Sequence, residues 1–257
     1  MKQLIAVCGL ASFLSSAFAG SMGDIGRESS FNGAYAGLGS GFSTFFVDDS
    51  HTTTLSSPVI SRTQKTHGTD TSVMFEGHLG YGQSVFERFY LGGKGSVFYT
   101  PINYLKQATN SITNGTVVTI NNNHNQISLK PLYNIDAVLG YELSTHWLPF
   151  IEGGLSITNV DSNNQQDSVQ MNFAGSNYEF ISSLNSKGYN VNYNLGAGLS
   201  YKIQDRLLLS AELVYNYLGR YSSTSSTVVP SGSETVSYNR TFQLTSLFAT
   251  ASYLFPV

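Results

Sequence analysis

The stretch Val191–Lys202, VNYNLGAGLSYK, alternates between two kinds of side chain along its whole length. One face carries Val, Tyr, Leu, Ala, Leu and Tyr, and the other carries Asn, Asn, Gly, Gly, Ser and Lys. A period of two is typical of a β-strand with one apolar and one polar face. In a soluble sandwich the apolar face packs against a second sheet, whereas in a membrane barrel it contacts lipid and the small polar face lines the lumen. This stretch alone leaves both architectures open.

The first residues have the pattern of an export signal. Lys2 precedes an apolar run from Leu4 to Leu14, and the small residues Ala17 and Ala19 follow it. This order predicts a signal peptide over residues 1–19, cleaved before Gly20, and a mature domain over residues 20–257. The single cysteine, Cys8, lies inside the apolar run, so we expect no lipid anchor, disulfide or cysteine-based metal site in the mature chain.

The composition favours a membrane barrel. No apolar run long enough for a transmembrane helix follows the signal. Charged residues make up 11% of the chain, against about 25% in typical soluble domains. Glycine (25), tyrosine (16) and phenylalanine (16) are abundant, as expected for a wall facing lipid with aromatic girdles. Without Lys2 the chain has 12 basic and 16 acidic residues, and no basic cluster occurs, so we expect no nucleic-acid binding.

Eight segments share the alternation of the first stretch, and each has about the length of one tilted membrane crossing. They are residues 35–42, 73–82, 89–99, 132–142, 149–158, 191–202, 207–219 and 241–255. Their connections alternate between short and long. The short ones are QSVFER, LSTHWL and IQDR, and the long ones, rich in Ser, Thr and Asn, are residues 43–72, 100–131, 159–190 and 220–240. Short turns at one end and long loops at the other are typical of an outer-membrane barrel.

Several motifs resemble the bacterial outer-membrane β-barrel family, which includes opacity-type surface proteins and the membrane domain of OmpA-like proteins. They are YAGLGSGF, YNLGAGLSYKI, QDRLLLSAELVYNYLG and the C-terminal TASYLF. The resemblance implies an all-β, eight-stranded antiparallel up-and-down transmembrane barrel in the outer membrane, with short periplasmic turns, long extracellular loops and both termini in the periplasm. It also implies contact with outer-membrane lipid and lipopolysaccharide. The family usually ends on an aromatic residue that the barrel assembly machinery recognises, whereas here Pro256 and Val257 follow Phe255.

The same alternation predicts an ion network inside the lumen, formed by Glu76, His78, Lys94, Asp136, Glu142, Glu152, Lys202 and Glu212. A turn centred near residue 85 sets Glu76 roughly across from Lys94. A turn near His146 and Trp147 sets Glu142 beside Glu152, and this like-charged pair needs a cation such as Lys202, or one protonated carboxyl. Two interpretations remain: a structural network that plugs the lumen, or a gated path that prefers cations.

Evidence for catalysis or for a bound cofactor is slight. His124 and Ser128 have matching parity in HNQIS and are the best candidates for a base and nucleophile near the rim. One histidine in an asparagine-rich loop is expected by chance, so we expect no enzyme. His51, His67 and His146 lack metal-ligand spacing, and His78 is expected to accept or donate a hydrogen bond in the lumen. We therefore expect no metal and no cofactor.

The sequence favours a surface protein with a structural or adhesion-type interaction role. The third long loop mixes Tyr, Phe, Met, Ser and Asn with few charges, a composition that suits recognition of host or envelope ligands. Loops are also hydrophilic and variable without any such role. A small-solute pore is the alternative, and a lipid-modifying enzyme is the third possibility.

Overall fold

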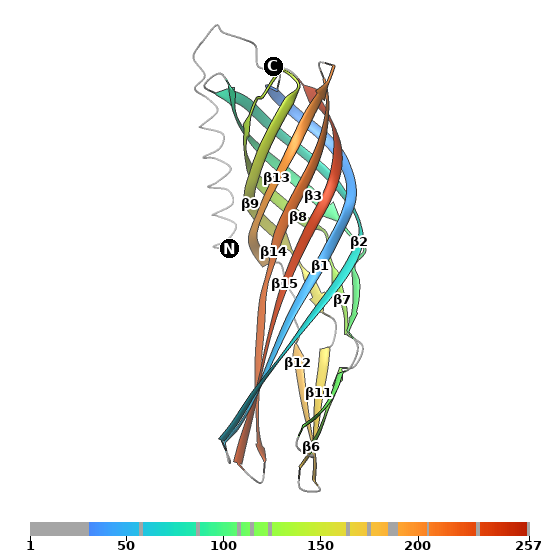
Figure 1. Cartoon of the computed structure of the whole chain (residues 1–257), viewed down its shortest axis with the longest axis vertical. Coiled ribbons are helices and arrows are strands. Elements are labelled where there is room, and N and C mark those ends of the chain that lie inside the picture. The colour runs from blue at the N-terminus through green and yellow to red at the C-terminus, as the bar shows by residue number, and fades with distance from the viewer. Residues whose placement is uncertain are drawn as a thin grey trace.

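Eight long strands form a closed antiparallel barrel (Figure 1). The computed structural model describes residues 31–56, 59–85, 88–106, 109–113, 116–122, 125–162, 165–173, 176–184, 190–204, 206–229 and 232–255. The barrel strands are β1 (Gly33–Ser56), β2 (Val59–Val85), β3 (Phe89–Tyr99), β8 (Leu132–Tyr141), β9 (Trp147–Thr158), β13 (Asn190–Ile203), β14 (Leu207–Val229) and β15 (Gly232–Phe255). Each pairs with the next along the chain, and β1 also pairs with β15, which closes the ring. The expected architecture is confirmed, and all eight expected strands lie in this barrel.

Two small sheets lie beyond the end of the barrel that carries the long connections. One contains β4 (Asn103–Lys106), β7 (Asn125–Leu129) and β10 (Val160–Ser162). The other contains β5 (Thr109–Thr113), β6 (Thr116–Asn122), β11 (Gln165–Phe173) and β12 (Ser176–Leu184). Both sheets combine strands from the second and third long connections, because β10 pairs with β7 and β11 pairs with β6. These two connections therefore support each other.

The sequence pattern had indicated loops for the other two long connections. They are instead continuations of the barrel strands. β1 and β2 stay paired to Ser56↔Val59, and β14 and β15 stay paired to Val229↔Gly232. Because β1 and β15 also pair out to Leu55↔Glu234, the outer parts of the four strands form one sheet, which we call the extension (Figure 1). It consists of residues 48–56, 59–67, 220–229 and 232–241. Its threonines are β-branched and fit a pleated sheet, although both of its faces are polar in composition.

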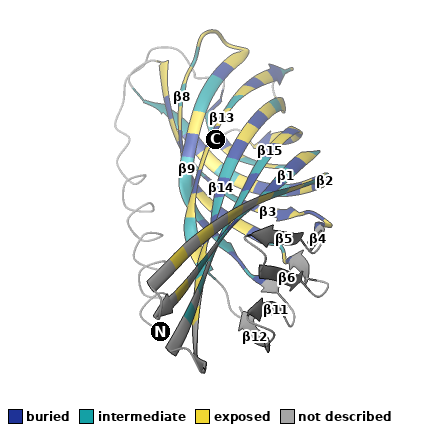
Figure 2. Cartoon of the chain, turned by 60° about the horizontal axis from the view of Figure 1, so that its bottom comes forward, coloured by how far each residue is buried: buried dark blue, intermediate teal, exposed yellow. Residues whose placement is uncertain are grey.

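The barrel wall has the two faces that the alternation predicts. In Figure 2 the strands are banded in yellow and blue, as exposed and buried residues follow each other. The large outward side chains include Leu38, 74% exposed, and Leu195, 62% exposed. Aromatic residues lie near the short turns, where the ring centroids of Trp147 and Tyr201 are 4.6 Å apart. None of the described residues forms a helix long and apolar enough to cross a membrane.

Close packing inside the barrel explains several glycines. A Cβ on Gly154 would meet the carbonyl oxygen of Ile135, and one on Gly41 would meet that of Leu247. An eight-stranded barrel is just wide enough for its inward side chains, so glycine makes room for larger neighbours. Where β14 leaves the barrel, the register shifts between Tyr217 and Gly219, and Gly219 has φ +111°. Leu218, the extra residue at this bulge, is fully buried like Asn216 before it, and beyond the bulge the odd-numbered residues of β14 pair with the inward residues of β15.

Candidate functional site: the barrel interior

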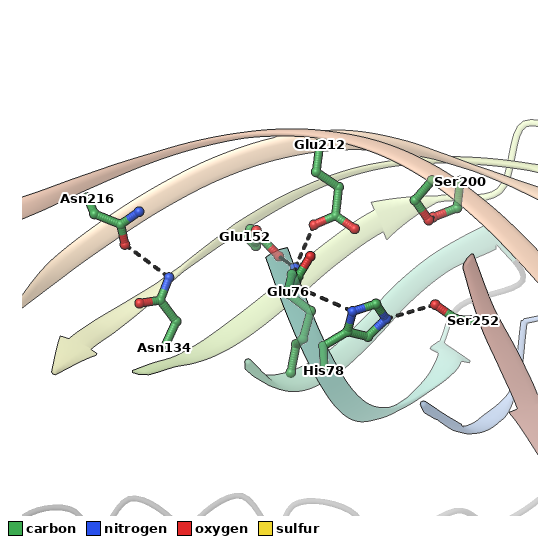
Figure 3. A network of polar contacts seen from close by, with 10 residues as sticks. Glu76, His78, Asn134, Glu152, Ser200, Glu212, Asn216 and Ser252 are labelled. Atoms are coloured by element: carbon green, nitrogen blue, oxygen red, sulfur yellow. Dashed lines mark hydrogen bonds and ion pairs between the residues drawn. The ribbon is translucent and has the colours of Figure 1, made fainter. Parts of the chain in front are cut away.

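Lys94 of β3 is the centre of the charged network. Its Nζ lies 2.6 Å from Glu152 Oε2, 2.7 Å from Glu212 Oε2 and 4.0 Å from Glu76 Oε1. All four residues are at most 5% exposed. Figure 3 shows Glu152 and Glu212 converging on one amine from different strands. A single buried ammonium therefore bridges three carboxylates, and Asp136 stands across from Lys94 in the register of β3 and β8.

His78 of β2 joins this network to β15, the next strand but one around the ring. Its Nε2 lies 2.7 Å from Ser252 Oγ, and its Nδ1 lies 3.3 Å from Glu76 Oε1 (Figure 3). Both side chains are buried. The ring thus links β15 to the carboxylate on its own strand, as expected for a lumen hydrogen-bond partner.

A neutral layer of polar side chains lies next to the ions. Asn134 Nδ2 donates to Asn216 Oδ1 at 3.0 Å (Figure 3). Ser156 Oγ donates to the same oxygen at 2.7 Å. Ser156 Oγ is also 2.9 Å from Asn134 Oδ1. The three residues come from β8, β9 and β14 and are almost fully buried. They were not among the residues predicted from the sequence, although their inward parity is visible in the strand pattern.

Two apolar layers enclose the polar ones. Near the ends of the strands that face the long connections, a first cluster contains Phe45, Val47, Met74, Phe98, Ile102, Leu129, Leu132, Val160, Val214, Leu218, Phe242, Leu244 and Phe248. Near the short turns, a second cluster contains Phe31, Tyr90, Val138, Leu148, Leu208 and Leu254. We call them the outer and inner apolar layers. The side chains of both layers point inward. The simple pattern of polar residues inside had implied a lumen that is polar throughout, and these two layers show that it is not.

Little empty space remains between these layers. A cavity of about 40 Å³ adjoins Lys94, Glu152, Glu212 and the inner apolar layer. A buried water needs about 10–15 Å³ of such volume, so the cavity has room for only a few waters. Hydrophobic constrictions in pores also block ions because water leaves them. The described interior is therefore a packed core with a polar centre.

The register corrects two expected pairings. Lys94 pairs with Gly80 and Glu76 pairs with Phe98, so the two residues are not directly across from each other. Glu152 pairs with Val138, and Glu142 lies just past the end of β8. The predicted Glu142–Glu152 pair was therefore wrong: Glu142 Oε1 instead accepts a hydrogen bond from Ser84 Oγ. The turns are centred about two residues away from the predicted positions, which moves each partner by four.

The structure also places the remaining candidates that lie within the described residues. Lys202 is buried near the short turns, on β13. His67 pairs with Asp48 at 2.5 Å on the exposed face of the extension, and His146 stacks on Tyr201. His124 lies outside the described residues, so the His124–Ser128 pair stays a prediction. Within the described ranges, no group of three or more His, Cys, Asp or Glu residues is arranged to hold a metal ion.

One further buried pair, missed by the sequence analysis, lies where the extension leaves the barrel. Arg240 of β15 binds Asp49 of β1 through two nitrogens, with Nη2 at 3.2 Å from Oδ2 and Nε on Oδ1. Both residues are only 4–6% exposed. The two residues are register partners on β1 and β15. The pair was not predicted because the composition of both segments had indicated loops. The pair fixes the base of the extension over the outer apolar layer.

The closed ring, the apolar outer wall and the packed polar centre define an eight-stranded outer-membrane β-barrel. The sequence matches the family model of the outer membrane protein beta-barrel domain over residues 5–245, and the chain belongs to this family. Its outer-membrane location follows from this membership.

Several solved structures are similar in fold. OprG from Pseudomonas aeruginosa is 13% identical, with a TM-score of 0.40 over 88% of this chain and 98% of that chain. The attachment invasion locus protein Ail of Yersinia pestis is 9% identical, with a TM-score of 0.35 over 87% and 99%. The outer membrane protease OmpT from Escherichia coli is 10% identical, with a TM-score of 0.38 over 90% and 99%. A search of the curated proteins found no match to this sequence.

Proposed function

We propose that this protein is a surface interaction protein, in which the barrel serves as a closed anchor and the long connections bind the partner. One observation supports this most: apolar layers lie on both sides of the polar centre of the described interior, while the strands continue outside the barrel. The outer and inner apolar layers enclose the Lys94 network, and β1, β2, β14 and β15 continue into the extension. A scaffold of this kind holds binding residues in place on a rigid base.

The small-solute pore is the second candidate, because one feature of the interior favours it. Lys94 is surrounded by Glu76, Glu152 and Glu212, so acidic groups outnumber the cation, and such a site prefers cations. The two apolar layers argue against conduction, since ions would have to cross both of them. An enzymatic role is not part of the proposal. We further propose that the barrel wall contacts lipopolysaccharide and that the assembly machinery inserts the chain.

Shortening the connections tests the interaction role. The register gives clean cuts: removing residues 51–64 brings Ser50 and Lys65 together, and removing 224–237 joins Ser223 to Tyr238. A third variant replaces residues 166–183, between the partners Gln165 and Leu184. Each cut is closed by an Asn-Gly turn, which suits a two-residue hairpin.

We expect all three variants to remain inserted and to change gel mobility on heating, because the barrel pairs are untouched. Cells that display the full chain should bind immobilised matrix proteins or epithelial cells, and at least one shortened variant should lose this binding. A lipid-modification assay on the same preparations should show no activity. Binding at full strength after all the cuts are combined would show that the long connections do not carry the function.

A further inference from the structure

The extension has two free edges, and they differ in charge. β2 pairs with β3 only from Phe75 onward, and β14 pairs with β13 only up to Asn216. Beyond these points, no strand of the described chain pairs with the outer side of β2 or of β14. The edge of β2, Val59–Met74, includes Arg62, Lys65 and Asp70. The free edge of β14 begins with the bulge and Arg220, and its outer part, residues 222–229, is SSTSSTVV, which has neither charge nor proline.

Free strand edges present unpaired backbone donors and acceptors to other chains. Natural proteins protect such edges with charged residues, proline or bulges. The β2 edge has the charges, and the β14 edge has none of these devices over residues 222–229. Threonine and valine also have high β-propensity. The uncharged edge of β14 is therefore suited to accept another strand.

We infer that residues 222–229 pair with the same residues of a second copy of this chain. An uncharged edge meets no like charge when it pairs with itself, whereas the β2 edge would bring its own charges close together. This inference rests on the proposed surface-interaction role and specifies the partner. The charge pattern therefore favours a second copy as the partner, because this uncharged segment can pair with itself without bringing like charges together.

Symmetry decides the geometry of this pair. Two identical edges related by a two-fold axis pair only in the antiparallel sense, since a parallel arrangement about such an axis would oppose donor to donor. The axis then stands perpendicular to the sheet. The extension continues the long axis of the barrel (Figure 1), which crosses the membrane. The two-fold axis is perpendicular to this direction and therefore lies in the plane of the membrane. The two copies consequently face each other from two opposing membranes, and the pairing tethers one membrane to another.

The test uses the full chain in two differently labelled populations of phosphatidylcholine and phosphatidylglycerol vesicles. Tethering is measured as the coincidence of the two colours. A two-fold axis that passes between the Ser225 residues of the two copies pairs residues 222–228 and sets Thr224 of each copy opposite Ser226 of the other. A Thr224→Lys/Ser226→Lys variant should lower tethering about tenfold or more, because like charges then face each other across the edge. The Thr224→Glu/Ser226→Glu variant should behave in the same way.

Mixing the populations separates edge pairing from other effects. Vesicles that carry the lysine variant should tether to vesicles that carry the glutamate variant, because opposite charges then face each other. A misfolded variant would not regain tethering in this way. The matched control is Thr69→Lys/Thr71→Lys on β2, where both residues are exposed, and it should tether like the unchanged protein. Absence of tethering by the unchanged protein, full tethering by the lysine variant, or an equal loss in the β2 control would overturn the inference. Adhesion to matrix that persists without tethering would leave the proposed function standing.

Discussion

The side chains of Lys94 and Glu212 meet at 2.7 Å across the full width of the barrel. Lys94 is on β3 and Glu212 is on β14, and these strands are four positions apart in either direction around the ring. The ion pair therefore spans a diameter and ties opposite walls together. Because this ion pair occupies the centre of the lumen, it stands in the way of a solute path. The packing of the interior is therefore consistent with the proposed role as an anchor.

Replacing Lys94 tests the importance of this central cation. The change Lys94→Met leaves Glu152 and Glu212 buried without their shared ammonium. Removing one partner of a buried ion pair costs about 3–5 kcal/mol, so the unfolding midpoint in urea should fall clearly. Adding Glu152→Gln and Glu212→Gln should restore most of the loss, because the two carboxylates nearest to Lys94 are then neutral amides. A single variant as stable as the unchanged protein would mean that Lys94 does not hold the network together.

Truncating phenylalanine to alanine should have different effects on the lumen side and on the lipid side of the barrel wall. Phe248 is 3% exposed in the outer apolar layer, and its ring centroid lies 5.7 Å from that of Phe98. Phe248→Ala should destabilise the barrel by about 3–5 kcal/mol through the cavity it leaves. Phe42 points outward and is 65% exposed, so Phe42→Ala should change stability much less. Equal effects in urea unfolding would contradict the assigned facing of these strands.

Gly154, which faces the lumen, tests how tightly the interior is packed, and Gly95, on the lipid side of β3, is its control. Gly154→Ala would push a methyl group onto the backbone of Ile135, so it should impair folding or lower the unfolding midpoint. Gly95 has open space at its Cβ position, and Gly95→Ala should be neutral or stabilise slightly, by about 0.5 kcal/mol. The comparison uses the same substitution on two barrel strands. If both variants unfold at the same urea concentration, the lumen is looser than described.

Much of the fold is predictable from period-two alternation, and the exceptions have physical reasons. Val191–Lys202 shows its two faces clearly, because one meets lipid and the other meets a narrow lumen. The extension was missed because Ser and Thr on both faces give no contrast between apolar and polar positions. The partners of Lys94 could not be derived from sequence, since a two-residue error in a turn centre displaces each partner by four. Contacts across the lumen, such as Lys94–Glu212, depend on ring closure and have no local pattern.

The pair Asp49–Arg240 should control the extension without controlling the barrel. Arg240→Gln removes the charge that binds both oxygens of Asp49. Protease should then cleave within residues 50–70 or 220–239 more readily, while the heat-dependent gel shift stays intact. The exposed pair Asp48–His67 offers a matched control, because surface ion pairs contribute little. Cleavage unchanged in Arg240→Gln, or increased equally in His67→Gln, would contradict this role.

Conductance in a planar bilayer tests the closed barrel most directly. The two apolar layers on either side of the Lys94 network predict that the purified full chain stays at the baseline of the bare membrane over a wide range of voltage. Parallel samples in detergent must show the heat-dependent gel shift, so that a silent trace comes from a folded barrel. Steady, cation-selective steps from the unchanged protein would contradict the account and would establish the pore in its place.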